Sequence, residues 1–117
     1  TLLIRIFRSE AKKVIATEAL IDTGFDGALV LSRSLGDFIA RFIQKADGFE
    51  ELDAAGIGIP CDVYLLEVSV GKEWLRVKAY SPRLGDLGTI IGRMVLNRLS
   101  VCLRGKEGKL FLAKVKR

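Results

Sequence analysis

The sequence predicts an all-β fold, a closed barrel accompanied by one or two helices. Many short apolar runs separated by regular turns carry this prediction, together with residues 63–70 and 74–80, in which apolar and polar residues alternate. Just two stretches have the apolar spacing of a helix. With 117 residues, we expect one domain over residues 1–117 that is large enough to bury a core.

The chain begins with a predicted hairpin. Residues 2–7 and 14–21 are rich in apolar side chains and flank the polar segment 8–13. This pattern predicts two antiparallel strands, the second of which ends at Asp22. Residues 28–31 then predict a short buried strand.

A helix is predicted next. Ser32 or Ser34 can cap its N-terminus, and we expect it to end near Gly48. Side chains at helical spacing form one apolar stripe, which we expect to face the core: Leu35, Phe38, Ile39, Phe42 and Ile43.

A second hairpin is predicted for residues 63–70 and 74–80, which alternate around Gly71 and Lys72. One face of this hairpin is apolar and should point inward. Its members are Tyr64, Leu66, Val68 and Val70, matched by Leu75, Val77 and Ala79.

The last quarter of the chain predicts a strand, a helix and a third hairpin. Pro82 and Gly85 interrupt the chain before a short strand at residues 89–91, and a helical stretch follows at 93–99. The third hairpin joins residues 100–104 to 109–115, with its turn at 105–108.

Charge and hydropathy limit the partners of the chain. The net charge is +5 and the pI about 9.5, but the basic residues are scattered except in the tail, so nucleic acid is not an expected partner. Apolar residues make up 50% of the chain and the mean hydropathy is +0.29, which is high for a small soluble domain. We therefore expect apolar surface that is covered in an oligomer.

Several classes of chemistry are excluded by composition. The chain has no His, and Cys61 and Cys102 lack metal-ligand spacing, so we expect free cysteines, no metal site and no cofactor. Phosphate-binding glycine motifs are absent. No apolar run could span a membrane and the start has no signal-peptide layout, which predicts a cytoplasmic protein, although the missing Met leaves the natural start open. Carboxylates and Lys remain as acid–base groups.

One carboxylate stands out within the stretch Leu-Ile-Asp-Thr-Gly-Phe-Asp-Gly at residues 20–27. A strand delivers Asp22 to a tight turn in apolar surroundings, where burial would be costly and would raise its pKa. Thr23 can lock the turn through its hydroxyl, and Gly24 permits unusual backbone dihedrals. Taken alone, the tripeptide is more typical of an ordinary Asx-type turn that closes a hairpin than of a catalytic site.

A second stretch, Thr-Ile-Ile-Gly-Arg-Met-Val-Leu at residues 89–96, favours a functional interpretation of the first. Together the two resemble the motifs of retroviral-type, or retropepsin-like, aspartic proteases, and in particular a small prokaryotic branch in which Phe follows Asp-Thr-Gly. The resemblance extends over roughly residues 2–112, and it implies a barrel of the retropepsin-like acid protease type.

The resemblance implies an aspartic endopeptidase acting on peptides or proteins. Because the chain has one Asp-Thr-Gly, two Asp22 carboxylates would have to meet across the axis of a homodimer, sharing one proton and activating a water. In the family, Thr23 would brace the paired loops and Gly24 would hydrogen-bond the substrate backbone. Asp26 and Arg93 occupy the positions of an ion pair that supports the active-site loop.

The family also implies a flap, a glycine-rich hairpin that covers the cleft. Gly56, Ile57 and Gly58 resemble its tip, while the alternative for residues 50–60 is a flexible surface loop. The implied substrate-binding positions are Phe25, Asp26, Gly56, Ile57 and Gly58.

Two departures from the family pattern keep a second hypothesis open. Phe25 stands where many relatives have Ala or Ser, and an aromatic ring there would narrow the cleft. The two ends of the chain also differ from those of the viral enzymes. The sequence therefore does not predict the intersubunit sheet that the viral termini form. The alternative is a catalytically silent dimeric module of the same fold that binds an extended peptide by strand addition.

Overall fold

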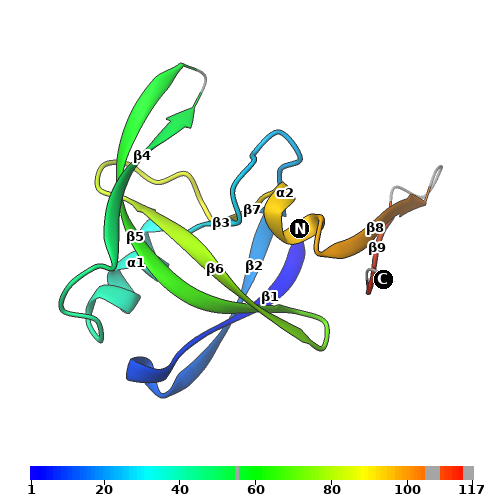
Figure 1. The fold of residues 1–117 in the computed structure, drawn as a ribbon, viewed down its shortest axis with the longest axis horizontal. Helices are drawn as coiled ribbons and strands as arrows, with labels where there is room; N and C mark the ends of the chain where they lie inside the picture. Colours follow the sequence, from blue (N-terminus) through cyan, green and yellow to red (C-terminus); the bar gives the residue numbers. More distant parts are fainter. Residues whose placement is uncertain (55, 105–108, 115–117) are drawn as a thin grey trace.

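Six strands close on themselves to form the barrel. The computed structural model describes residues 1–54, 56–104 and 109–114. In the barrel, the strands are hydrogen-bonded in the order β1-β2-β7-β3-β6-β5, and β1 also pairs with β5, which closes the ring; β4 extends the sheet beyond β5 (Figure 1). The strands are β1 (Leu2–Arg8), β2 (Lys13–Ile21), β3 (Leu29–Val30), β4 (Gly48–Ala54), β5 (Ile57–Val70), β6 (Glu73–Pro82) and β7 (Ile90–Ile91). The predicted all-β barrel is confirmed.

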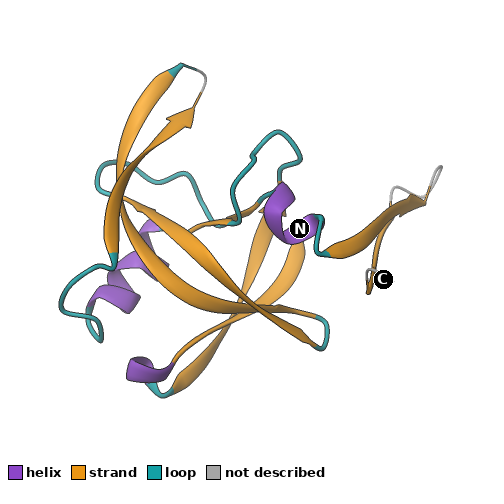
Figure 2. Ribbon diagram, in the orientation of Figure 1, coloured by secondary structure: helices purple, strands orange, loops and turns teal. Residues whose placement is uncertain are grey.

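The hairpins that the sequence predicts are present. β1 and β2 are antiparallel and connected through a single 3-10 turn, η1 (Ser9–Ala11). β5 and β6 are also antiparallel, and both extend beyond their predicted ranges. β4 and β5 form a further hairpin, which projects from the barrel in Figure 2. The predicted flap is thus a hairpin and not an irregular loop.

The core fills the barrel with aliphatic side chains. Alternation along β5 and β6 turns one face inward, as predicted, and every member of that face is buried except Leu75, which is partly buried against the core. Burial of a large aliphatic side chain contributes about 1.5–3 kcal/mol. The most deeply buried large side chains include Ile4, Ile6, Leu29, Leu31, Leu66, Val68 and Ile91.

Both helices are shorter than the sequence predicts. α1 (Arg33–Ala40) is capped by Ser32, whose hydroxyl accepts a hydrogen bond from Leu35 N at 3.3 Å. It ends eight residues before Gly48, because the chain must turn for Asp47 N to reach Val63 O on β5, at 2.9 Å. Ile43 is buried beyond the helix end.

The C-terminal part leaves the barrel after α2 (Arg93–Leu96), which ends three residues before the predicted boundary. β8 (Leu99–Arg104) and β9 (Lys109–Lys114) then pair as a separate two-stranded sheet that extends away from the barrel (Figure 1). The turn predicted at residues 105–108 lies outside the described residues. Among the described residues, no helix has the length and apolar character needed to cross a membrane.

Candidate active site

The site starts at the end of β2, where Asp22 leaves the sheet. Asp22 N still donates to Ile91 O on β7, at 2.9 Å, so the barrel fixes its backbone. Its side-chain Oδ1 accepts a hydrogen bond from Gly24 N at 2.9 Å, and Phe25 N donates to its carbonyl oxygen at 3.2 Å. Asp22 therefore closes its own turn. The Thr23 hydroxyl, expected to lock this turn, makes no hydrogen bond within the described part of the chain.

The carboxylate is exposed in the single chain, contrary to the burial that the apolar flanking residues suggest. The flanking residues belong to the barrel, and the turn lies beyond the end of β2, so Asp22 is left exposed by the described part of the chain. Gly24 was also expected to have unusual dihedrals, yet its φ is negative. A Cβ there would lie 3.2 Å from Asp22 Oδ1, a tight contact that a small shift of the Asp22 side chain would relieve.

The second motif packs directly against the first. Besides the bonds from Leu20 N to Thr89 O and from Asp22 N to Ile91 O, the loop is held by backbone hydrogen bonds from Gly92 N to Ala28 O, Arg93 N to Phe25 O and Met94 N to Gly27 O, all at 2.8–3.1 Å. Gly92 cannot be replaced easily, since a Cβ at this position would overlap Gly27 O and lie 2.7 Å from Phe25 O. The two sequence motifs therefore form one structural unit.

Asp26 and Arg93 form the predicted ion pair, between Asp26 Oδ1 and an Arg93 guanidinium nitrogen. The side chains are 80% and 52% exposed. Exposed pairs contribute about 0–1 kcal/mol, so in a single chain this contact orients the loop more than it stabilises the fold.

A cleft of about 670 Å³ opens beside the Asp22 turn and beneath the β4–β5 hairpin. The active-site turn forms one wall, and the incoming arm of the hairpin forms the other through Leu52, Asp53 and Ala54. Val30, Tyr80, Leu87 and Ile90 line much of the rest. Three acidic residues, Asp22, Asp26 and Asp53, also belong to the lining, which includes no lysine or arginine. An apolar cleft with few polar groups suits an extended peptide.

The flap tip is placed partly as expected. Gly56 lies at the turn with φ +83°, a left-handed conformation that favours glycine, and its N–H donates to Asp53 Oδ1 at 3.0 Å. Ile57 and Gly58, however, belong to β5 and pair with Ala54 and Asp53. None of Gly56, Ile57 and Gly58 is among the residues that line the cleft of the single chain.

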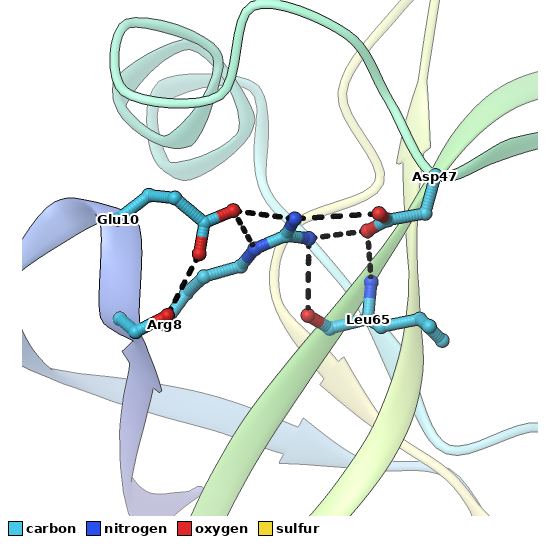
Figure 3. A network of polar contacts seen from close by, with 5 residues as sticks. Arg8, Glu10, Asp47 and Leu65 are labelled. Carbon is cyan, nitrogen blue, oxygen red and sulfur yellow. Dashed lines mark hydrogen bonds and ion pairs between the residues drawn. The ribbon is translucent and has the colours of Figure 1, made fainter.

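The base of the flap is held by a polar network that the sequence does not reveal (Figure 3). Arg8 at the end of β1 forms ion pairs with Glu10 and Asp47, and Asp47 Oδ2 also accepts from Leu65 N on β5 at 2.8 Å. The hydrogen bond from Arg8 is the main reason that the pKa of Asp47 lies below its usual range, and the same guanidinium lowers the pKa of Glu10 to about 2. Asp47 directly precedes β4, so the network fixes where the flap begins.

Other cleft residues also escaped prediction. Val30 pairs with Tyr80 on β6 and with Ile90 on β7, and all three line the cleft together with Leu87. These pairings join residues far apart in the chain. The sequence offered one indication of these cleft residues, because Ile90 belongs to the second motif.

No group of three metal-ligating side chains occurs among residues 1–54, 56–104 and 109–114. Of the two cysteines, Cys61 is free and buried, and burial raises the pKa of its thiol. The motif and the cleft both contain the carboxylate of Asp22.

The barrel and the hairpin that projects from it have the fold of retropepsin-like aspartic proteases. The chain is similar to a retropepsin-like aspartic protease from Rickettsia conorii, with 24% identity and a TM-score of 0.63 over 94% of this chain and 80% of that one. It is also similar to EIAV protease, solved in complex with the inhibitor HBY-793, with 16% identity and a TM-score of 0.55 over 83% and 84% of the two chains. No protein-family model matches the sequence, and neither does any curated protein.

Proposed function

We propose that this protein is an aspartic endopeptidase that acts as a homodimer. The observation that carries the proposal is the position of Asp22: an exposed carboxylate, fixed by the barrel, beside a cleft beneath a hairpin in a retropepsin-like fold. Its exposure supports a dimer, because a second chain placed against this turn would desolvate the carboxylate and bring its own Asp22 close.

In the proposed mechanism, the two Asp22 carboxyls share one proton. Like charges held close together cannot both ionise, so one carboxyl stays protonated and the other is charged. The charged one takes a proton from a water molecule as that water attacks the peptide carbonyl carbon, and the protonated one donates to the carbonyl oxygen, which gives a tetrahedral diol. The newly protonated carboxyl then donates its proton to the peptide nitrogen as the C–N bond breaks, while the other carboxylate takes a proton back from the diol, so the pair returns to its starting state. Gly24 lies next to the site, where its backbone would bind the substrate main chain.

The test is hydrolysis of an unfolded protein. We expect the purified chain to cleave casein between pH 4 and 6, and pepstatin to inhibit the cleavage. Asp22→Asn should abolish it, whereas Asp37→Asn, on the exposed face of α1, should not. Full activity of the Asp22→Asn variant would refute the proposal.

The alternative, a silent peptide-binding module, is favoured by one observation: β4 pairs only with β5 and leaves its other edge free in the described part of the chain. An extended peptide could add to that edge. Binding of a peptide library by both the parent and Asp22→Asn, with no product formed by either, would favour this alternative.

A further inference from the structure

The aromatic ring of Phe25 sits in a slot between two glycines. A Cβ at Gly27 would lie 2.5 Å from Phe25 Cζ and 2.8 Å from Cε1, and a Cβ at Gly92 would lie 2.5 Å from Cδ2. The ring therefore occupies the space that side chains at both positions would need. Tyr80 contacts it edge-on, with ring centroids 6.3 Å apart and an interplanar angle of 75°.

This slot joins three parts of the site. Gly27 belongs to the active-site turn, Gly92 to the loop before α2, and Tyr80 to β6. The backbone of Phe25 is held as well, because its N–H donates to Asp22 O and its carbonyl accepts from Arg93 N. A ring fixed on three sides, three residues after Asp22, restrains the turn that carries the carboxylate.

We propose that Phe25 is a positioning residue, whose ring locks the Asp22 turn against the second motif and β6. In this role it neither blocks the cleft nor selects the substrate, although Phe25 is among the residues that line the cleft. The part of the proposal that concerns catalysis rests on the proposed function.

The first test needs no activity and compares two glycine substitutions in two backgrounds. The atoms nearest to a Cβ at Gly27 all belong to the Phe25 ring. Gly27→Ala should therefore lower the melting temperature of the parent clearly and that of Phe25→Ala much less. Gly92→Ala is the matched control: its Cβ also overlaps backbone carbonyl oxygens, which Phe25→Ala leaves in place, so its cost should persist in both backgrounds. An equal cost of Gly27→Ala in both backgrounds would overturn the proposal.

The second test asks whether the ring holds the turn that carries Asp22. Hydrogen exchange of the Gly24 amide reports that turn, because this amide donates to Asp22 Oδ1. Phe25→Ala should speed the exchange roughly two- to tenfold, the change in opening equilibrium that loss of one aromatic pair produces. Phe42→Ala, which removes a ring outside the site, should leave it unchanged. Unchanged exchange in Phe25→Ala would overturn the proposal.

Kinetics then separate positioning from substrate selection. Phe25→Ala should lower kcat by about 100-fold, the cost of a small misplacement, with little change in KM, and Phe25→Leu should recover part of the loss. A raised KM with unchanged kcat, or a gain in activity, would overturn the proposal. An inactive parent would refute the proposed function instead, and the two activity-independent tests would still decide whether Phe25 holds the turn.

Discussion

At the scale of single residues, Asp22 is the group on which the proposed chemistry depends. Asp22→Asn keeps the size of the side chain and can still accept the hydrogen bond from Gly24 N, but it cannot act as a base. In the proposed dimer it would also remove the repulsion between two carboxylates at the axis. We expect peptidase activity to vanish while dimer stability at pH 7 holds or rises, as measured by casein cleavage and sedimentation.

The parent should show a bell-shaped pH profile on the acid side of neutrality, since the pair works only with one proton. Simple structural damage by Asp22→Asn would lower both activity and stability. That result would count against a proton-sharing pair.

The ion pair between Asp26 and Arg93 gives a second residue-scale prediction. Breaking a buried pair costs on the order of 3 kcal/mol, but these side chains are 80% and 52% exposed. We therefore expect Asp26→Ala and Arg93→Ala to show a coupling below about 1 kcal/mol in a double-mutant cycle of urea unfolding. A coupling near zero would mean that the contact contributes nothing, and one near 3 kcal/mol would mean that the pair is buried in solution.

Sequence patterns located Asp22, Asp26 and Arg93, because their spacing within two motifs carries the information. They did not predict the slot between Gly27 and Gly92 that holds the ring of Phe25. The sequence alone predicts that this ring narrows the cleft. That slot depends on Gly92, which is far from Phe25 in the sequence, and on Tyr80. The position of Tyr80 follows from the parallel pairing of β3 with β6, which no local sequence pattern encodes.

At the scale of elements, the ion pair between Arg8 and Asp47 holds the base of the flap in a pH-dependent way. The pKa of Asp47 is lowered in the folded chain, mainly by the hydrogen bond from Arg8. Such a group stabilises the fold above its unfolded pKa of about 3.9, and the contribution is lost as the pH falls through the lower folded pKa. The ion pair between Arg8 and Asp47 therefore persists from pH 4 to 6, the range in which the proposed activity is tested.

Asp47→Asn can still accept from Leu65 N but loses the charge that faces Arg8. We expect it to lower the free energy of unfolding by about 1 kcal/mol at pH 7, and the difference from the parent should shrink below pH 3. Urea unfolding at both pH values measures this, with Asp37→Asn as the exposed control. A difference that does not depend on pH would show that charge is not its cause.

The hairpins could be predicted because strand alternation and turn residues are local. Helix lengths could not: Phe42 and Ile43 continue the apolar stripe of α1, yet the chain leaves the helix at Ala40 so that Asp47 can pair with β5. The closure of the barrel between β1 and β5 is equally non-local.

At the scale of the whole molecule, one chain presents a single exposed Asp22 and several exposed apolar side chains. Leu84, Ile57 and Leu3 are 74%, 68% and 65% exposed, and Met94 beside the active-site loop is 51% exposed. Burial of such side chains favours association. Sedimentation at micromolar concentration should give about twice 12.9 kDa. A monomer that hydrolyses peptides would exclude the paired-carboxylate mechanism.

Mixing active and inactive chains tests the proposed shared site most directly, because such a site would need an Asp22 from both subunits. When wild-type chains are mixed with an equal amount of Asp22→Asn and allowed to exchange, random pairing places half of the wild-type chains in heterodimers that lack one carboxylate. Activity should then fall to about half of what the same amount of wild-type chain gives alone. Asp37→Asn, mixed in the same way, should cause no loss. If Asp22→Asn leaves the activity unchanged after exchange is verified by mass-labelled subunits, each chain carries a complete site of its own.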